Sequence, residues 1–331
     1  MFRYRILLIA IAVLLGACTA KTAIPIEFPT PEPPPQATPI QTLELKRDPE
    51  LEKQFAMIAE AAKGKVGAAA VVLETGDAAL LNADGHYPMQ SVYKLPIAMA
   101  MMDSIRRGEH DLDEKIGVTP EDFVRPGQAS VLRDKNPNGG EFTIRELMRL
   151  ALVESDGTAS DVLLRVLGGP AEVDAYLRQI GIRDMKVVNT EKEIGRDWQT
   201  QYENWATPLA AVELLHRLDV TADHWKPPNL DQELNESQLL LQFMFESKPG
   251  PKRIKGELKL ESPLLVAAHK TGTGGTQNGI VAATNDIGII YRPDGTRIAI
   301  AVFVSDSPAD EKTREAVIAK IAKAAFDRWR K

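Results

Sequence analysis

Segments with the pattern of β-strands occur only near the two ends of this chain, and a long helical stretch separates them. Near the first end, residues 66–73 and 78–81 flank Glu74-Thr-Gly-Asp77, a composition typical of a hairpin turn. The strand-like segments near the other end are 264–270, 279–284, 287–292 and 297–304. Because isolated strands must pair to be stable, the two ends are expected to meet in one sheet region, with the helical stretch inserted between them.

Helical spacing of apolar residues accounts for most of the remaining chain. The predicted helices are 43–63, 91–107, 143–153, 158–166, 170–180, 208–218, 232–247 and 309–329. Between residues 111 and 246 the pattern predicts no strand. The sequence therefore predicts a mixed α/β (α+β) fold with a sheet lobe of about 42–105 and 248–331 and a helical lobe of about 106–247. A cleft between two such lobes is the expected site.

The first 41 residues have a different composition from the rest. Arg3 and Arg5 precede an apolar run, 6–15, which is too short to span a bilayer and is typical of a secretory signal. Leu15-Gly-Ala-Cys18 resembles a lipobox, so residues 1–17 are expected to be removed and Cys18 to be lipidated. The alternative is an Ala-type or uncleaved signal. Residues 18–41 are rich in proline and predict a semi-rigid linker before a catalytic domain of 42–331.

Charge and cysteine content exclude several kinds of chemistry. The formal net charge of -6 offers no basic face for nucleic acid. A single cysteine permits neither an internal disulfide nor a cysteine-rich metal cluster. The histidines show no paired metal-ligand spacing, so we expect no metal and no cofactor.

Ser91-Val-Tyr-Lys94 has the spacing of a serine nucleophile and its base. Residues three apart share one face of a helix, so Lys94 can reach the Ser91 hydroxyl. Ser91 is expected to begin that helix, where free backbone amides favour a developing negative charge. Two residues are a weak motif on their own, and a surface serine beside a solvated lysine is the alternative.

Two further segments support the chemical interpretation. Lys270-Thr-Gly-Thr273 follows an apolar stretch at the end of a predicted strand, where Gly272 would let a ligand approach the backbone closely. Ser155-Asp-Gly157 lies in a break between two predicted helices, so the Ser155 hydroxyl can project into a cleft. His269 alternates to the opposite strand face from Lys270 and is interpreted as a packing residue.

Taken in order, Ser91-x-x-Lys94, Ser155-Asp-Gly157 and Lys270-Thr-Gly272 resemble the three motifs of class A serine β-lactamases and penicillin-binding proteins. The resemblance extends over about residues 45–331. The segments MQSVYKLPIAM, VLGGP, QYENWATP, HKTGTGG and ATNDIGII are most similar to the PER-type, extended-spectrum branch of class A. The resemblance implies an antiparallel sheet flanked by helices, with an inserted all-helical lobe.

The resemblance also implies roles for individual residues. Lys94, or Glu191 through a water, would take the Ser91 proton, and Glu191 would activate the water that hydrolyses the acyl-enzyme. Glu193 is the competitor for that second role, and a solvated loop charge is the alternative for either residue. The backbone amides of Ser91 and Thr273 would form the oxyanion hole. Ser155 would pass a proton to the leaving nitrogen.

The substrate carboxylate would be held by Lys270, Thr271 and Thr273, with Arg253 as a further candidate whose alternative is a surface charge. Gly157 and Gly195 depart from the family pattern, which commonly has asparagine at both positions. An asparagine at 157 would contact Lys94 and the substrate, and one at 195 would hold the hydrolytic water. Gly157 therefore puts turnover or substrate spectrum in doubt. At 195 the PER-type branch also departs from the family pattern, so the alternative is that another group positions the water.

The expected function is β-lactam hydrolysis, and with it antibiotic resistance, by a periplasmic, lipid-anchored monomer with no nucleic-acid partner. The outer membrane is preferred for the anchor, because Thr19 supplies no aspartate after Cys18. Two alternatives stay open at this stage. One is a D-Ala-D-Ala peptidase, and the other is a β-lactam- or peptidoglycan-binding module that does not hydrolyse its ligand.

Overall fold

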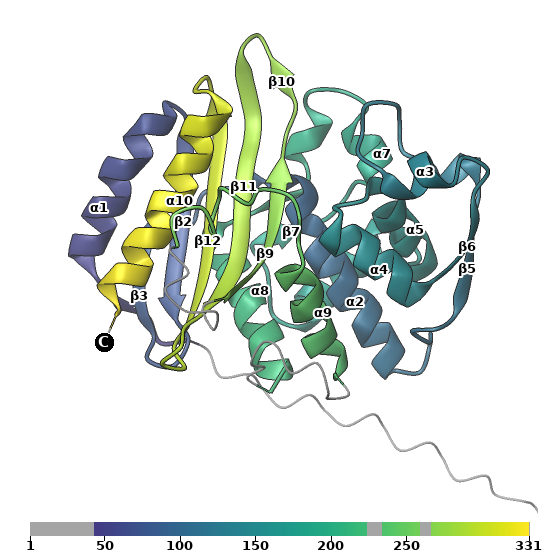
Figure 1. Ribbon diagram of the computed structural model, residues 1–331, viewed down its shortest axis with the longest axis horizontal. Coiled ribbons are helices and arrows are strands. Elements are labelled where there is room, and N and C mark those ends of the chain that lie inside the picture. The colour runs from purple at the N-terminus through teal and green to yellow at the C-terminus, as the bar shows by residue number, and fades with distance from the viewer. Residues whose placement is uncertain (1–42, 224–233, 259–265, 331) are drawn as a thin grey trace, which may run out of the picture. The chain divides into compact units, whose positions relative to one another are not determined.

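The structure, a computed structural model, describes residues 43–223, 234–258 and 266–330 (Figure 1). The expected signal, 1–17, Cys18 and the linker up to residue 41 lie outside the described residues. In the described part of the chain, no helix combines the length and the apolar character that a membrane span requires.

Most long helices and strands near both ends of the described chain overlap the predicted segments, but the predicted helix 43–63 is wrong at its start, where β1 precedes α1. The helices are α1 (Pro49–Ala59), α2 (Lys94–Arg106), α3 (Val131–Lys135), α4 (Ile144–Val153), α5 (Gly157–Leu167), α6 (Pro170–Gln179), α7 (Glu191–Ile194), α8 (Pro208–Thr221), α9 (Glu236–Phe245) and α10 (Glu311–Arg328), with single 3-10 turns η1 (Glu60–Ala62), η2 (Gln90–Tyr93), η3 (Pro120–Asp122) and η4 (Thr200–Tyr202). The strands are β1 (Lys46–Arg47), β2 (Lys65–Val72), β3 (Asp77–Leu81), β4 (Tyr87–Pro88), β5 (Lys115–Val118), β6 (Gly140–Thr143), β7 (Met185–Lys186), β8 (Trp205–Ala206), β9 (Val266–Thr273), β10 (Thr276–Gln277), β11 (Ile280–Tyr291) and β12 (Arg297–Ser307).

The main sheet combines strands from both ends of the described chain. Its order is β1-β3-β2-β12-β11-β10, and β9 also pairs with β11. All of these pairings are antiparallel except the short one between β1 and β3. The antiparallel sheet that the resemblance implied is therefore present, and β9, which carries the Lys270 motif, pairs with the long strand β11.

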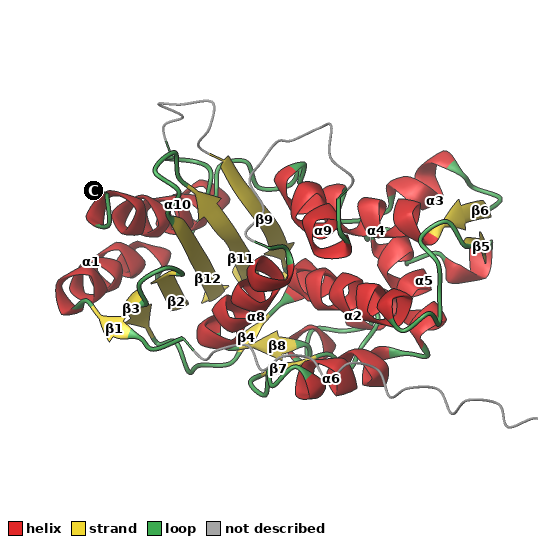
Figure 2. Ribbon diagram, turned by 90° about the horizontal axis from the view of Figure 1, so that it is seen from below, coloured by secondary structure: helices red, strands yellow, loops and turns green. Residues whose placement is uncertain are grey.

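Alternation along β12 divides the core into two layers. Val302 and Val304 belong to the cluster that includes Leu51 of α1 and Ile318 of α10. Phe303, between them, belongs to the cluster under α2 and α8. Successive side chains of a strand point to opposite faces, so one face of the sheet is covered by α1 and α10, and α8 and α9 pack on the other (Figures 1 and 2).

Side-chain caps fix where the helices around the site begin. Thr143 and Glu146 form a reciprocal capping box at the start of α4. The Asp156 side chain accepts a hydrogen bond from the Ala159 amide and caps α5. Asp156 is thus the last residue of the loop between α4 and α5, and its cap holds the neighbouring Ser155 directly before α5.

The prediction of an all-helical middle was wrong in one respect. Strand β5 pairs with β6, and β7 and β8 form a small sheet with β4. These strands have only two to four residues each, which is too short for alternation to be visible in the sequence. Their pairing partners lie far along the chain and cannot be read from local pattern.

Strand β11 is continuous where the sequence predicted two strands, 279–284 and 287–292. Asn285 and Asp286 suggested a break because both residue types are depleted in strands. Both are fully buried in the structure. The Asn285 amide donates to the Pro88 carbonyl at 2.7 Å, and Asp286 accepts from the Ile254 amide at 3.1 Å. These bonds pair the Asn285 amide nitrogen and the Asp286 carboxylate and let the strand run through, while Asn285 Oδ1 stays buried without a hydrogen-bond partner among the described residues.

Candidate active site

Ser91 lies in the turn η2, directly before α2. The sequence placed it at the helix start, and the 3-10 turn continues straight into that helix. The preceding residue, Gln90, has a φ of 49°, a strained value for a residue with a side chain. The Lys94 ammonium donates to Ser91 Oγ over 3.0 Å. The nucleophile and a nitrogen that can exchange its proton are therefore in contact.

Ser155 joins the two lysines of the motifs. Its carbonyl accepts a hydrogen bond from Lys94 Nζ at 2.7 Å, and its hydroxyl accepts one from Lys270 Nζ at 2.9 Å. Ser155 has a φ of 58°, so this connection is also strained. Lys94 and Lys270 are 1% and 0% exposed and lie beneath the floor of the site.

The charge of Lys94 affects the protonation of Lys270. Burial and the nearby Lys94 charge hold the pKa of Lys270 well below its ordinary value, because both penalise a second positive charge. Part of this effect is offset by Asp286 and Glu191. Lys270 is thus a group whose proton is weakly held, and it contacts the Ser155 hydroxyl.

Glu191 is the first residue of α7 and faces the same lysine. Its Oε2 lies 3.3 Å from Lys94 Nζ, and 16% of its side chain is exposed. The Glu191 amide donates to Asp161 Oδ1 at 2.6 Å. Glu193, the competitor, is exposed, and its Oε2 accepts from the Thr190 amide in a capping box. Of the two carboxylates, Glu191 is the one beside Lys94.

Arg253 is buried, 3% exposed, which excludes the alternative of a surface charge. Its guanidinium donates to Thr273 Oγ1 at 2.8 Å and to the carbonyls of Gly272 and Asn285 at 3.1 and 3.0 Å. Its Nε donates to Glu315 at 3.2 Å. Arg253 therefore positions the end of β9 and brings a positive charge to Thr273.

Gly272 permits a close approach, but of a different partner from the one expected. A Cβ at this position would collide with the Met89 carbonyl and lie 3.1 Å from Gln90 Cβ. The space is filled by the turn before Ser91 and not by a ligand. Gly272 thus brings β9 against the nucleophile turn.

Neighbouring side chains also occupy the space beside the two glycines that depart from the family pattern, Gly157 and Gly195. A Cβ at Gly157 would lie 2.7 Å from Glu191 Cγ. A Cβ at Gly195 would lie 2.6 Å from Gln128 Nε2, and that same amide donates to the Glu191 carbonyl. The side chains of Glu191 and Gln128 therefore occupy the places of the two absent side chains.

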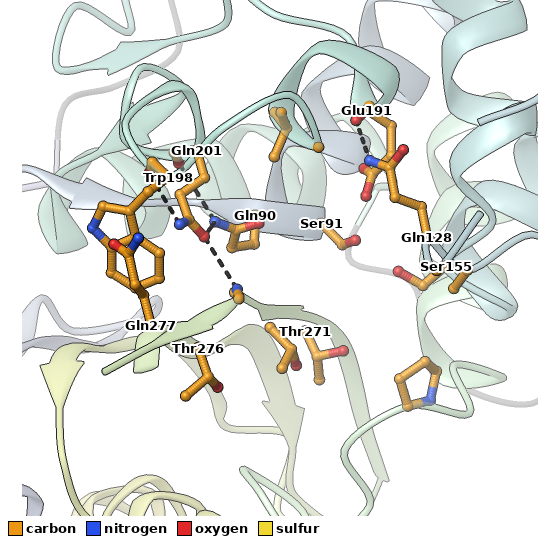
Figure 3. Close-up of a pocket in the computed structure, with 18 of the residues that line it drawn as sticks. Gln90, Ser91, Gln128, Ser155, Glu191, Trp198, Gln201, Thr271, Thr276 and Gln277 are labelled. Atoms are coloured by element: carbon orange, nitrogen blue, oxygen red, sulfur yellow. Dashed lines mark hydrogen bonds between the residues drawn. The ribbon is translucent and has the colours of Figure 1, made fainter. Parts of the chain in front are cut away.

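These elements surround a cleft of about 660 Å³ (Figure 3). Among the expected residues, Ser91, Ser155, Glu191, Thr271 and Thr273 line it. Its other lining residues are Gln90, Gly127, Gln128, Ala129, Glu154, Ile194, Gly195, Asp197, Trp198, Gln201, Pro249, Gly274, Gly275, Thr276 and Gln277. Lys94, Lys270, Gly157, Gly272 and Arg253 lie behind this surface. Cys18 lies outside the described residues.

Sequence reasoning missed three residues that hold Glu191. Gln128 and Asp161 bind its backbone, as described above. Tyr93, inside the Ser91–Lys94 motif, donates from its hydroxyl to Glu191 Oε2 at 3.1 Å. The position of Tyr93 beside the nucleophile was a usable signal, whereas Gln128 and Asp161 had none. His269 is fully buried and contacts Asp286, in line with a packing role.

The fold and the meeting of one serine, two amines and one carboxylate are the arrangement that serine acyl transfer requires. Residues 50–329 match the family described as the Beta-lactamase enzyme family. The chain therefore belongs to that family.

Individual relatives narrow the class. The chain is 35% identical to β-lactamase VEB-1 of Pseudomonas aeruginosa, over 82% of this chain and 87% of that one. It is 33% identical to the extended-spectrum β-lactamase PER-1 of the same organism, over 95% of each. A β-lactamase structure from Chitinophaga pinensis DSM 2588 superposes with a TM-score of 0.78 at 37% identity, covering 85% of this chain and 100% of that one. The chain is thus a class A serine β-lactamase of the PER-type branch, a hydrolase acting on β-lactams.

Proposed function

We propose that this enzyme hydrolyses β-lactams through a covalent ester on Ser91, which a water activated by Glu191 then releases. The observation that carries the proposal is the position of Lys94. One ammonium lies 3.0 Å from the nucleophilic oxygen and 3.3 Å from the carboxylate of Glu191. The Lys94 ammonium therefore contacts both Ser91, which would form the ester, and Glu191, which would activate the water that hydrolyses it.

In the acylation step, Ser91 Oγ attacks the lactam carbonyl carbon and loses its proton. Lys94 in its neutral form, or Glu191 through a water, accepts that proton. The carbonyl oxygen becomes negative and is held by the backbone N–H groups of Ser91 and Thr273, each donor contributing on the order of 3 kcal/mol. The ring C–N bond then breaks, and the nitrogen takes a proton through the Ser155 hydroxyl.

The chemistry of the binding groups fits the carboxylate that β-lactams carry beside the ring nitrogen. Thr271 and Thr273 offer hydroxyl donors at the cleft, and Lys270 lies directly behind Ser155. Arg253 donates to Thr273 Oγ1 at 2.8 Å. This bond uses the lone pair of the Thr273 oxygen and leaves its proton for the substrate.

In the deacylation step, a water gives a proton to Glu191 as its oxygen attacks the ester carbonyl. The Ser91 oxygen leaves and takes up the proton that Glu191 received, passed on through Lys94, so both Ser91 and Glu191 return to their starting forms. Glu191→Ala is expected to leave a stable penicilloyl-enzyme, and Ser91→Ala to abolish nitrocefin hydrolysis. A Ser91→Ala protein that hydrolyses nitrocefin at the wild-type rate would refute the proposal.

The same preparations discriminate the alternative functions. A D-Ala-D-Ala peptidase would release D-Ala from a cell-wall peptide without turning over nitrocefin. A binding module would give a burst of acylation and no steady rate. We expect a steady rate with nitrocefin, because the space at Gly157 and Gly195 is filled by Glu191 and Gln128.

Export and anchoring form a separate part of the proposal. Residues 1–17 act as a secretory signal, and lipidation of Cys18 ties the enzyme to a membrane in the periplasm as a monomer. In cells grown with a labelled fatty acid, the wild-type protein should carry label, and Cys18→Ala should not. Equal labelling of the two proteins would overturn the anchoring proposal.

A further inference from the structure

Tyr93 contributes a hydroxyl group that the acyl-transfer scheme above does not use. It stands between Ser91 and Lys94 in η2, and its side chain is fully buried. A phenylalanine would fill nearly the same volume without burying an oxygen. Burying a hydroxyl costs free energy unless it is hydrogen-bonded. The Tyr93 hydroxyl does have such a bond, to Glu191 Oε2 at 3.1 Å.

Tyr93 is a permanent donor in this contact. Burial, together with the negative charges of Glu191 and Asp161, raises the pKa of Tyr93 well above its ordinary value. The phenol therefore keeps its proton throughout the pH range in which such an enzyme works. A carboxylate has no proton to give when ionised, so the hydroxyl must be the donor.

The contacts of Glu191 engage its backbone and its Oε2, and they leave Oε1 to act as the base. Its backbone N–H is held by Asp161 Oδ1 at 2.6 Å, and its backbone carbonyl accepts from the Gln128 amide. Its Oε2 receives the Tyr93 hydroxyl and faces Lys94 Nζ at 3.3 Å. With the main chain fixed and Oε2 engaged twice, Oε1 is the atom left to accept a proton from a water in the cleft.

We propose that Tyr93 is a positioning residue for Glu191. Its hydroxyl fixes the rotation of the carboxylate, so that Oε1 faces the water, and it favours the ionised form that can act as a base. The inference rests on the proposed role of Glu191 in deacylation. Tyr93 touches neither substrate nor ester in this account and acts only through the carboxylate.

Three other ionisable groups lie around the Glu191 carboxylate. Lys94 Nζ of α2 is 3.3 Å from its Oε2, and the Glu191 charge raises the pKa of Lys270 on β9 and of Asp161 on α5. Gln128, in the loop before α3, binds the Glu191 backbone carbonyl and carries no charge. Replacing Tyr93 with phenylalanine changes none of these charges, so a change in pH dependence reports on the hydrogen bond itself.

The test compares Tyr93→Phe with the wild type and with a matched control, Tyr176→Phe. Tyr176 is also a buried tyrosine, on α6, outside the cleft residues. The acyl-enzyme with benzylpenicillin is formed by rapid mixing, and its decay is followed by mass spectrometry from pH 4.5 to 9. In Tyr93→Phe we expect the acid limb of the decay rate to move upward by about one pH unit. Below that limb, decay should be roughly tenfold slower. The control should follow the wild type.

A double-mutant comparison separates the two proposals. If Tyr93 acts through Glu191, adding Tyr93→Phe to Glu191→Gln should leave the residual decay rate unchanged within about twofold. Suppose that Glu191→Gln does not deacylate, but Tyr93→Phe has the decay rate and the acid limb of the wild type. That result overturns the role of Tyr93 and leaves the role of Glu191 intact. Normal deacylation in Glu191→Gln overturns the proposed function itself.

A second variant keeps the test decisive if Tyr93→Phe does not fold. Fluorotyrosine incorporated at position 93 keeps the shape of the ring and makes the hydroxyl a stronger donor. The acid limb is then expected to move in the opposite direction, toward lower pH. An unchanged limb in this folded protein would overturn the inference.

Discussion

A methyl group at position 157 would test how tightly the position of Glu191 controls deacylation. In Gly157→Ala the new Cβ would lie 2.7 Å from Glu191 Cγ and 3.2 Å from the Ala129 carbonyl oxygen. Ordinary contact begins at 3.4 Å, so Glu191 Cγ has to move by about 0.7 Å, the difference between 3.4 and 2.7 Å. The carboxylate is held by Lys94 and Tyr93, so the movement strains those contacts.

The expected loss follows from that displacement. Misplacing a reacting group by about 1 Å costs on the order of 100-fold in rate. We therefore expect deacylation in Gly157→Ala to slow by roughly 10- to 100-fold. Acylation should change by less than about threefold if Lys94 is its base, because the contact between Ser91 and Lys94 is not disturbed. Overpacking should also lower the free energy of unfolding by about 1–3 kcal/mol.

The assay is rapid quenching of the reaction with benzylpenicillin, with the acylated fraction read by mass. Gly157→Ala should accumulate acyl-enzyme during turnover. Gly117→Ala is the control, because a Cβ there meets no atom within 4 Å. Deacylation of Gly157→Ala at the wild-type rate, in a folded protein, would refute the argument that this glycine makes room for Glu191.

Two further predictions concern groups behind the cleft. Arg253→Lys cannot reproduce the fork to Thr273, Gly272 and Asn285. We expect a raised KM for penicillins and a loss of about 3 kcal/mol in unfolding free energy, measured by urea denaturation; an unchanged KM would exclude a role in substrate binding. Burial raises the pKa of Asp161 to about 7 from 3.8, so between these pH values the native state binds a proton that the unfolded state does not. This group alone therefore makes stability fall as pH rises from about 4 to 7. Asp161→Asn should remove that component from urea midpoints measured across the range, and parallel curves for the two proteins would contradict the assignment.

Local pattern was sufficient for much of the architecture. The hairpin of β2 and β3 and the helices α4, α6 and α8 lie close to their predicted bounds. Their periodicity is clear, and their ends carry residues with direct backbone effects, such as the capping box at Thr143 and the prolines at the starts of α6 and α8. Such signals act within one or two turns and are therefore visible in the sequence.

Long-range contacts decided the features that the sequence did not predict. Strand β11 continues through Asn285 and Asp286, where the Pro88 carbonyl and the Ile254 amide, both far along the chain, supply hydrogen bonds. The short pair of β5 and β6 forms across more than twenty residues. Local propensity contains no information about either event.

The same distinction applies to the site. Motif order and spacing identified Ser91, Lys94, Ser155 and Lys270, and the family resemblance added Glu191. The structure brings these five side chains together. The sequence could not predict why glycine stands at positions 157 and 195, because the atoms that occupy the space beside these glycines belong to Glu191 and Gln128. Gln128 lies 63 residues before the carbonyl it binds.

The most direct test of the acyl-serine account is the mass of Glu191→Gln during reaction with benzylpenicillin, followed by peptide mapping of the adduct. We predict an adduct of one intact penicillin on Ser91 that forms rapidly and persists while wild-type enzyme returns to its free mass. An adduct on another residue, or an adduct that disappears from the variant as fast as from the wild type, would contradict the account.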